Sequence, residues 1–180
     1  MDLAALLEQN REAILAKWFA LISRTYPQAT SEFLAKQQDQ FRNPVGHAIS
    51  ENIGPIFDQV VSAMETDELR HALDGIIRIR SVQEFTPSQA VGFIFQLKTV
   101  IRDVVDAQIQ SPQKGYDLTE LESRVDQVAL LAFDTYTECR EKLHQVQANE
   151  IRSRTANLLH RVNLKPGVSQ NGGEPIDEDM

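Results

Sequence analysis

The sequence has a single cysteine, Cys139, among its 180 residues, which excludes a disulfide within the chain. It also lacks long apolar runs: the longest, such as Val128–Phe133, are far too short to span a bilayer. The N-terminal pattern MDLAALLEQNREAIL has the character of neither a signal peptide nor a transit peptide. Together these absences predict a cytoplasmic protein without a transmembrane segment.

Positive charge is also scarce. The formal net charge is −8, whereas a surface that binds nucleic acid must be basic to neutralise phosphates. Patterns of catalytic residues are missing too, because the chain has no HExxH, no GxGxxG and no serine–histidine–acid arrangement. We therefore expect neither a nucleic-acid partner, nor a metal site, nor an enzyme.

Helical periodicity runs through most of the chain. Apolar residues recur at three- and four-residue spacings, and proline or glycine separates the segments. No segment shows sustained strand alternation. The pattern predicts an all-α fold, a single domain of about six helices with a long C-terminal helix. The predicted helices cover about residues 2–24, 30–42, 44–64, 67–83, 87–105 and 118–162.

Two helix starts are clearly marked. Pro44 suits the first turn of a helix, although Gly54-Pro55 within that helix predicts a kink or a second break. The segment Thr86-Pro87-Ser88-Gln89 combines a capping hydroxyl, a proline at the first helical position and a glutamine three residues after the cap. The helix that follows is apolar over much of its circumference, which predicts a central, buried helix.

The last helix is the longest and carries one apolar stripe. If it continues through Ile151, Leu158 and Val162, it extends beyond the rest of the domain and is suited to pairing with a second copy. We expect residues 1–147 to form the domain, 148–163 a helical extension and 164–180 a disordered acidic tail. The residues predicted for the dimer interface are Leu121, Val125, Val128, Ala132, Tyr136, Leu143 and Val146.

Few residues suggest chemistry. Two histidines on helices, His47 and His71, are candidate haem ligands if both face one apolar pocket, but a surface or hydrogen-bonded role is the simpler interpretation. Cys139 lies on the apolar stripe, so we expect a buried structural thiol. Arg78 and Arg80 lie near a helix end, where cations complement the helix dipole; the alternative is that they bind a small anion or an acidic partner.

Several carboxylates lie on adjacent predicted helices. The functional interpretation is that a pair of them acts as the acid and the base of a catalytic site. Such pairs need a shared cleft and divergent pKa values, and a solvated helix face explains them more simply. These residues are Asp103, Asp106, Glu120, Glu122 and Asp126.

Two segments resemble a known family. FRNPVGHAI (Phe41–Ile49) and RIRSVQEFTPSQAVGFIFQLK (Arg78–Lys98), and the spacing between them, are similar to the N-terminal domain of the RsbR/RsbRD co-antagonists of bacterial stressosomes. The resemblance covers roughly Leu6 to Leu143. It implies a globin-like helical fold without haem, a dimer, and a sensory or protein-contact role above a phosphorylatable STAS domain.

The resemblance carries over only in part. The sequence ends at residue 180, so we do not expect it to supply the STAS domain, stressosome assembly or kinase capture. By the same resemblance His71 would be the proximal haem ligand and His47 a distal one. We expect a non-enzymatic, globin-like regulatory module without a cofactor, which acts as a homodimer on an unknown regulatory protein partner. The alternative is a sensor that binds haem or a small hydrophobic ligand between the helices that start at Pro44, Asp67 and Pro87.

Overall fold

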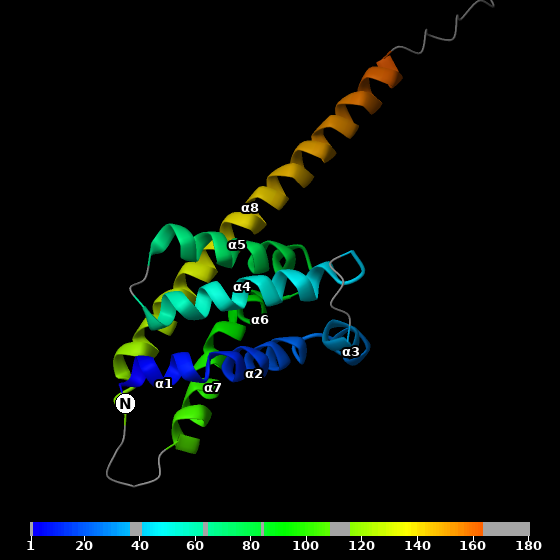
Figure 1. Ribbon diagram of the computed structural model, residues 1–180. Helices are drawn as coiled ribbons and strands as arrows, with labels where there is room; N and C mark the ends of the chain where they lie inside the picture. Colours follow the sequence, from blue (N-terminus) through cyan, green and yellow to red (C-terminus); the bar gives the residue numbers. More distant parts are fainter. Residues whose placement is uncertain (1, 37–40, 63–64, 84, 109–115, 164–180) are drawn as a thin grey trace, which may run out of the picture. The chain divides into compact units, whose positions relative to one another are not determined.

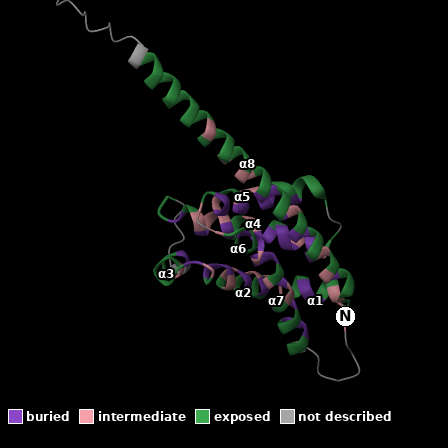
Figure 2. Cartoon of the chain, turned by 180° about the vertical axis from the view of Figure 1, so that it is seen from behind, coloured by how far each residue is buried: buried purple, intermediate pink, exposed green. Residues whose placement is uncertain are grey.

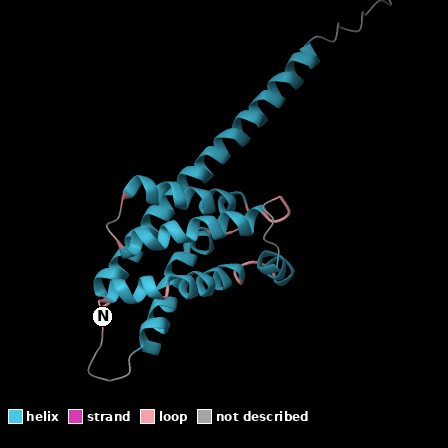
Figure 3. Ribbon diagram, in the orientation of Figure 1, coloured by secondary structure: helices cyan, strands magenta, loops and turns pink. Residues whose placement is uncertain are grey.

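The computed structural model describes residues 2–36, 41–62, 65–83, 85–108 and 116–163, and these contain eight helices and no strand (Figures 1 and 3). The predicted all-α fold is confirmed. The elements in chain order are α1 (Leu3–Gln9), α2 (Arg11–Ser23), α3 (Gln28–Lys36), α4 (Pro44–Val61), α5 (Thr66–Val82), α6 (Pro87–Val91), α7 (Phe93–Gln108) and α8 (Thr119–Asn163).

The two helices beyond the predicted six arise from two breaks. Asn10 separates α1 from α2, and its side-chain Nδ2 donates to the carbonyl oxygen of Leu6 at 2.8 Å. Gly92 separates α6 from α7, where a Cβ atom would lie 2.6 Å from the carbonyl oxygen of Ser88. Both breaks are single residues within apolar periodic segments, so periodicity alone does not reveal them.

The helix starts follow their capping residues. The side chain of Asn43 caps α4 by accepting from the backbone N–H of Gly46 at 2.8 Å, and Pro44 occupies the first turn. At α6, Thr86 and Gln89 form the predicted capping box. By contrast, α4 continues through Gly54 and Pro55, so the predicted second break does not occur. Buried residues on both sides of Pro55 hold the helix in the core, which offsets the cost of about 3 kcal/mol for an internal proline.

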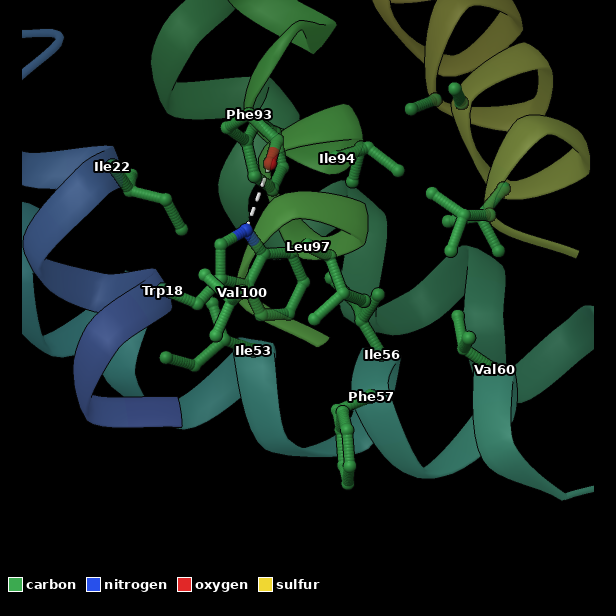
Figure 4. Packing of buried hydrophobic residues seen from close by; sticks show 14 of the residues in the cluster. Trp18, Ile22, Ile53, Ile56, Phe57, Val60, Phe93, Ile94, Leu97 and Val100 are labelled. Carbon is green, nitrogen blue, oxygen red and sulfur yellow. Dashed lines mark hydrogen bonds between the residues drawn. The ribbon is translucent and has the colours of Figure 1, made fainter. Parts of the chain in front are cut away.

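The chain divides into two compact units, Met1–Lys142 and Leu143–Met180. The core of the first unit lies among α2, α4, α5 and α7, which pack against one another in pairs. Figure 4 shows Trp18 of α2 between α4 and α7, where its indole N–H donates to the carbonyl oxygen of Phe93 at 2.8 Å. Phe93 and Ile94 are both fully buried, which confirms α7 as a central helix.

The second unit is helical over its described residues, because α8 runs without a break to Asn163. The sequence analysis set the domain boundary after residue 147, and the predicted tail, 164–180, lies outside the described residues. Most of the residues of this unit whose burial is described, 143–161, are exposed (Figure 2). Among the described helices, none is long and apolar enough to cross a membrane.

Candidate functional site

A charged residue, Arg80, lies in the core of the first unit. The inner face of α5 is lined by Leu73, Ile76 and Ile77, and Arg80 follows on the same face one turn later, with its side chain fully buried. Arginine is almost never fully buried without a partner. This residue is therefore the most unusual polar feature of the described core.

Three aromatic rings surround the Arg80 guanidinium, and we call this group the Arg80 cage. The Cζ atom of Arg80 lies 4.2 Å from the ring centroid of Phe85, 5.2 Å from that of Tyr26 and 5.4 Å from that of Phe93. Tyr26 and Phe85 also contact each other edge to face, with ring centroids 5.2 Å apart. The rings come from three separate segments: the turn after α2, the link between α5 and α6, and the start of α7.

Hydrogen bonds satisfy only one end of the guanidinium. Its Nη2 donates to Oγ1 of Thr25 at 3.1 Å and to the carbonyl oxygen of Gln89 at 2.9 Å. Its Nε and Nη1 are buried and have no hydrogen-bond partner. The buried Tyr26 hydroxyl makes no hydrogen bond of regular geometry either, although it lies close enough to the guanidinium to interact with it. Among the described residues, no carboxylate forms an ion pair with Arg80.

The energetic terms around Arg80 nearly cancel. Burial of an ion costs several kcal/mol even after the surroundings relax. The three cation–π contacts return about 0.5–2 kcal/mol each, and each hydrogen bond to a charged group about 1.5–3 kcal/mol. A buried donor without an acceptor costs about 1–3 kcal/mol, so Nε and Nη1 remain a net cost. Burial also lowers the pKa of Arg80, partly offset by Tyr26, and raises the pKa of the Tyr26 phenol.

Helix α8 contacts the same end of the first unit. The hydroxyl of Tyr136 donates to the carbonyl oxygen of Phe85 at 3.2 Å, and Nη1 of Arg140 donates to the carbonyl oxygen of Ser81 at 3.0 Å. Both bonds hold backbone that adjoins Arg80 and its nearest ring. The backbone at the end of α5 and in the link to α6 is thus hydrogen-bonded to α8. The ring of Phe85, in the same link, contacts the Arg80 guanidinium.

The comparisons with known proteins bear on this geometry. The model of the RsbT co-antagonist protein rsbRD N-terminal domain matches residues 12–151, which include the whole of the Arg80 cage. The chain belongs to this family. RsbRD N-terminal domains are regulatory signalling domains associated with the stressosome, and the family is not one of enzymes. A search of curated proteins and a search of solved structures each gave no match.

The histidines of this RsbRD-type domain do not face its core. His71 is exposed on α5, and the half-buried His47 places its Nε2 3.1 Å from Oε1 of Glu51 on the next turn of α4. Haem ligation needs an imidazole inside an apolar pocket. The described positions of these two side chains do not fit a haem held between α4 and α5. His144 and His160 are exposed on α8.

The carboxylates lie on the outer surface and pair with cations. Asp126 contacts Lys98 at 2.6 Å, and Glu122 accepts from Arg102 at 2.7 Å, a hydrogen bond that lowers the pKa of Glu122. Glu120 pairs with Arg124 along α8, and Asp103 and Asp106 are exposed. In the described part of the chain, no group of histidine, cysteine and acidic side chains is arranged to hold a metal ion. Cys139 is half-buried rather than buried, because its side of α8 is partly exposed to solvent.

The residues predicted for a dimer interface fall into two groups. The structure buries the first five in the core of the same unit, so they face α8's own neighbours and not a second molecule; these are Leu121, Val125, Val128, Ala132 and Tyr136. The stripe that the sequence assigned to a partner is therefore the inner face of α8 up to Tyr136. Leu143 is half-buried and Val146 is exposed in the second unit.

The sequence pattern favours Arg80 as a cation at a helix end and does not place it in the core. Arg80 is indeed in the last turn of α5, but its side chain is buried, whereas that of Arg78 is exposed and pairs with Asp74 at 2.8 Å. A usable signal was present, because Arg80 lies three and four residues after Ile77 and Ile76 on one helix face.

Proposed function

We propose that this RsbRD-type domain is a non-enzymatic regulatory module that acts as a homodimer paired through α8. Membership of a signalling-domain family supports the regulatory class. The arrangement of charges supports the absence of catalysis, because the candidate carboxylates Glu120, Glu122 and Asp126 are engaged in surface ion pairs rather than gathered in a cleft.

The observation that carries the homodimer is an exposed apolar seam on α8. Ala148, Ile151, Thr155 and Leu158 follow one another at spacings of three, four and three residues, which is the a/d pattern of a coiled coil. Ile151 is 65% exposed and Leu158 is 62% exposed. Large apolar side chains exposed in such a row mark a surface that binds another protein.

The charged residues beside this seam are compatible with a second copy of α8 as its partner. With Ala148 at position a, Arg152 occupies position e and Arg154 position g. In a parallel pair, position g faces position e of the next heptad on the other helix. Gln147 would then face Arg152, and Arg154 would face Leu159, so no two arginines oppose each other. A homodimer in parallel register therefore avoids like-charge repulsion at these positions.

We also propose that the fold is globin-like and works without haem. The described chain has eight helices, which is the number of helices in the globin fold. Six of them, α2 to α7, pack against one another in pairs. The exposure of His71 and the contact of His47 with Glu51 support the absence of haem. The resemblance to stressosome co-antagonists supports a regulatory protein as the partner of the dimer.

Light scattering during size-exclusion chromatography tests the homodimer. We expect the full chain to have the mass of two copies and the double variant Ile151→Glu, Leu158→Glu to have the mass of one, because four carboxylates would be buried in the seam. The control, Ser153→Glu with Ala156→Glu, adds the same charge on the outer face of α8 and should stay dimeric. A full-length chain with the mass of one copy contradicts the proposal.

A further inference from the structure

We propose that the Arg80 cage binds a small oxyanion of the carboxylate or phosphate class, held between the guanidinium of Arg80 and the hydroxyl of Tyr26. The cage contains a buried positive charge that no described carboxylate neutralises. Buried charges in proteins are normally paired or hydrogen-bonded. A ligand that complements this site therefore carries negative charge and accepts hydrogen bonds.

The free polar atoms of the cage define the chemistry of the ligand. Nε and Nη1 of Arg80 are donors without acceptors, and the Tyr26 hydroxyl beside them makes no hydrogen bond of regular geometry, so its proton is available to an acceptor. An oxyanion accepts from a guanidinium and a phenol together, and hydrogen bonds to ions are the strong ones. A cation would be repelled by Arg80, and an apolar ligand would leave all three groups unsatisfied.

The position of Phe85 indicates the direction of access. Phe93 and Tyr26 are buried, whereas Phe85 is half-buried and lies closest to the guanidinium. The unpartnered atoms are closed off from solvent in the described structure. Binding therefore requires the ring of Phe85 to shift, which limits the ligand to a compact anion.

Anion binding at this position would alter a contact between the cage and α8. The carbonyl oxygen of Phe85 accepts from the hydroxyl of Tyr136, so a shift of Phe85 changes a hydrogen bond to α8. The site would give the proposed signalling module its input, and only this use of the site rests on the proposed function. Anion binding itself is independent of dimerisation and is measured separately from it.

Thermal melts of the full chain test the site, with sodium phosphate and sodium acetate compared with sodium chloride at equal ionic strength. For the matching anion we expect the Tm to rise by about 2–4 °C at a concentration about fivefold above its Kd. The response should disappear in Arg80→Lys, because an ammonium cannot reproduce the planar donors. Arg78→Lys, on the exposed face of the same helix, should respond like the unaltered chain.

Tyr26→Phe provides a conservative variant, since it removes only the hydroxyl and keeps the ring that contacts the Arg80 guanidinium. We expect at least a severalfold weaker anion response from it. The NMR signal of the Arg80 Nε–H in the unaltered chain gives a second measurement, independent of any variant, and should shift with anion concentration.

Three results would overturn the proposal. The first is an unchanged Tm and an unchanged Arg80 Nε–H signal with both anions. The second is an equal response from Arg80→Lys and the unaltered chain, which would show a general salt effect. The third is an equal response from Tyr26→Phe and the unaltered chain, which would show that the anion does not lie at the cage.

Discussion

At the scale of residues, a few buried side chains join segments that are distant in sequence. Trp18 connects α2 to α7 through the carbonyl oxygen of Phe93, and their rings are 6.1 Å apart. Asn43 caps α4 and also donates to the carbonyl oxygen of Leu34 at 3.2 Å. Arg80 connects α5 to the turn after α2 and to α6. Each of these side chains has both a packing role and a polar role.

Substitution of Phe93 tests the packing at this scale. Phe93 is 1% exposed and contacts both Trp18 and Arg80, whereas Phe95, two residues later, is 46% exposed. We expect Phe93→Ala to lower the free energy of unfolding by about 3–5 kcal/mol, because it leaves a cavity. Phe95→Ala is the matched control and should cost less than about 1 kcal/mol. Urea unfolding measures both values, and equal effects would contradict the assignment of Phe93 to the core.

The burial of Arg80 in the core could not be predicted from the sequence, whereas the helix starts could. Capping residues act locally, so the starts of α4 and α6 could be predicted from Pro44 and Thr86. The environment of Arg80 depends on rings from three distant segments, which no local pattern brings together. A lone arginine in a helix is normally exposed, and this expectation favoured the helix-dipole interpretation.

At the scale of elements, α8 combines two different faces. Up to Tyr136 its apolar stripe packs into the core, and Arg124 of the same helix donates to the carbonyl oxygens at the end of α4, including that of Val60 at 3.3 Å. From Ala148 to Leu158 a second row of residues begins with the half-buried Ala148 and exposes the apolar side chains of Ile151 and Leu158. The two rows have the same three- and four-residue spacing, so the sequence predicted the helix but could not tell which row packs within the chain.

Breaks within helices were also beyond the sequence pattern. The splits at Asn10 and Gly92 depend on one side-chain hydrogen bond and on one close backbone approach. Conversely, Pro55 suggested a break that the surrounding core prevents. Propensity is a weak guide wherever tertiary packing opposes it.

At the scale of the whole molecule, the proposal that the fold works without haem can be tested. Haemin titration tests this directly, with absorbance in the Soret region as the measurement. We expect no stoichiometric, saturable Soret shift, because His71 is exposed and His47 pairs with Glu51. A saturable shift that is lost in His71→Ala but kept in His144→Ala, an exposed histidine on α8, would support the haem sensor instead.

The pairing of two copies along α8 is the central claim, and the distance between spin labels measures it most directly. A nitroxide is attached to Ser153→Cys, on the outer face of α8, in a chain that carries Cys139→Ser so that no other thiol is present. The account predicts one defined distance between the labels of two chains, which is lost when Ile151→Glu and Leu158→Glu are added. A signal without any defined distance in the chain with an intact seam would contradict it.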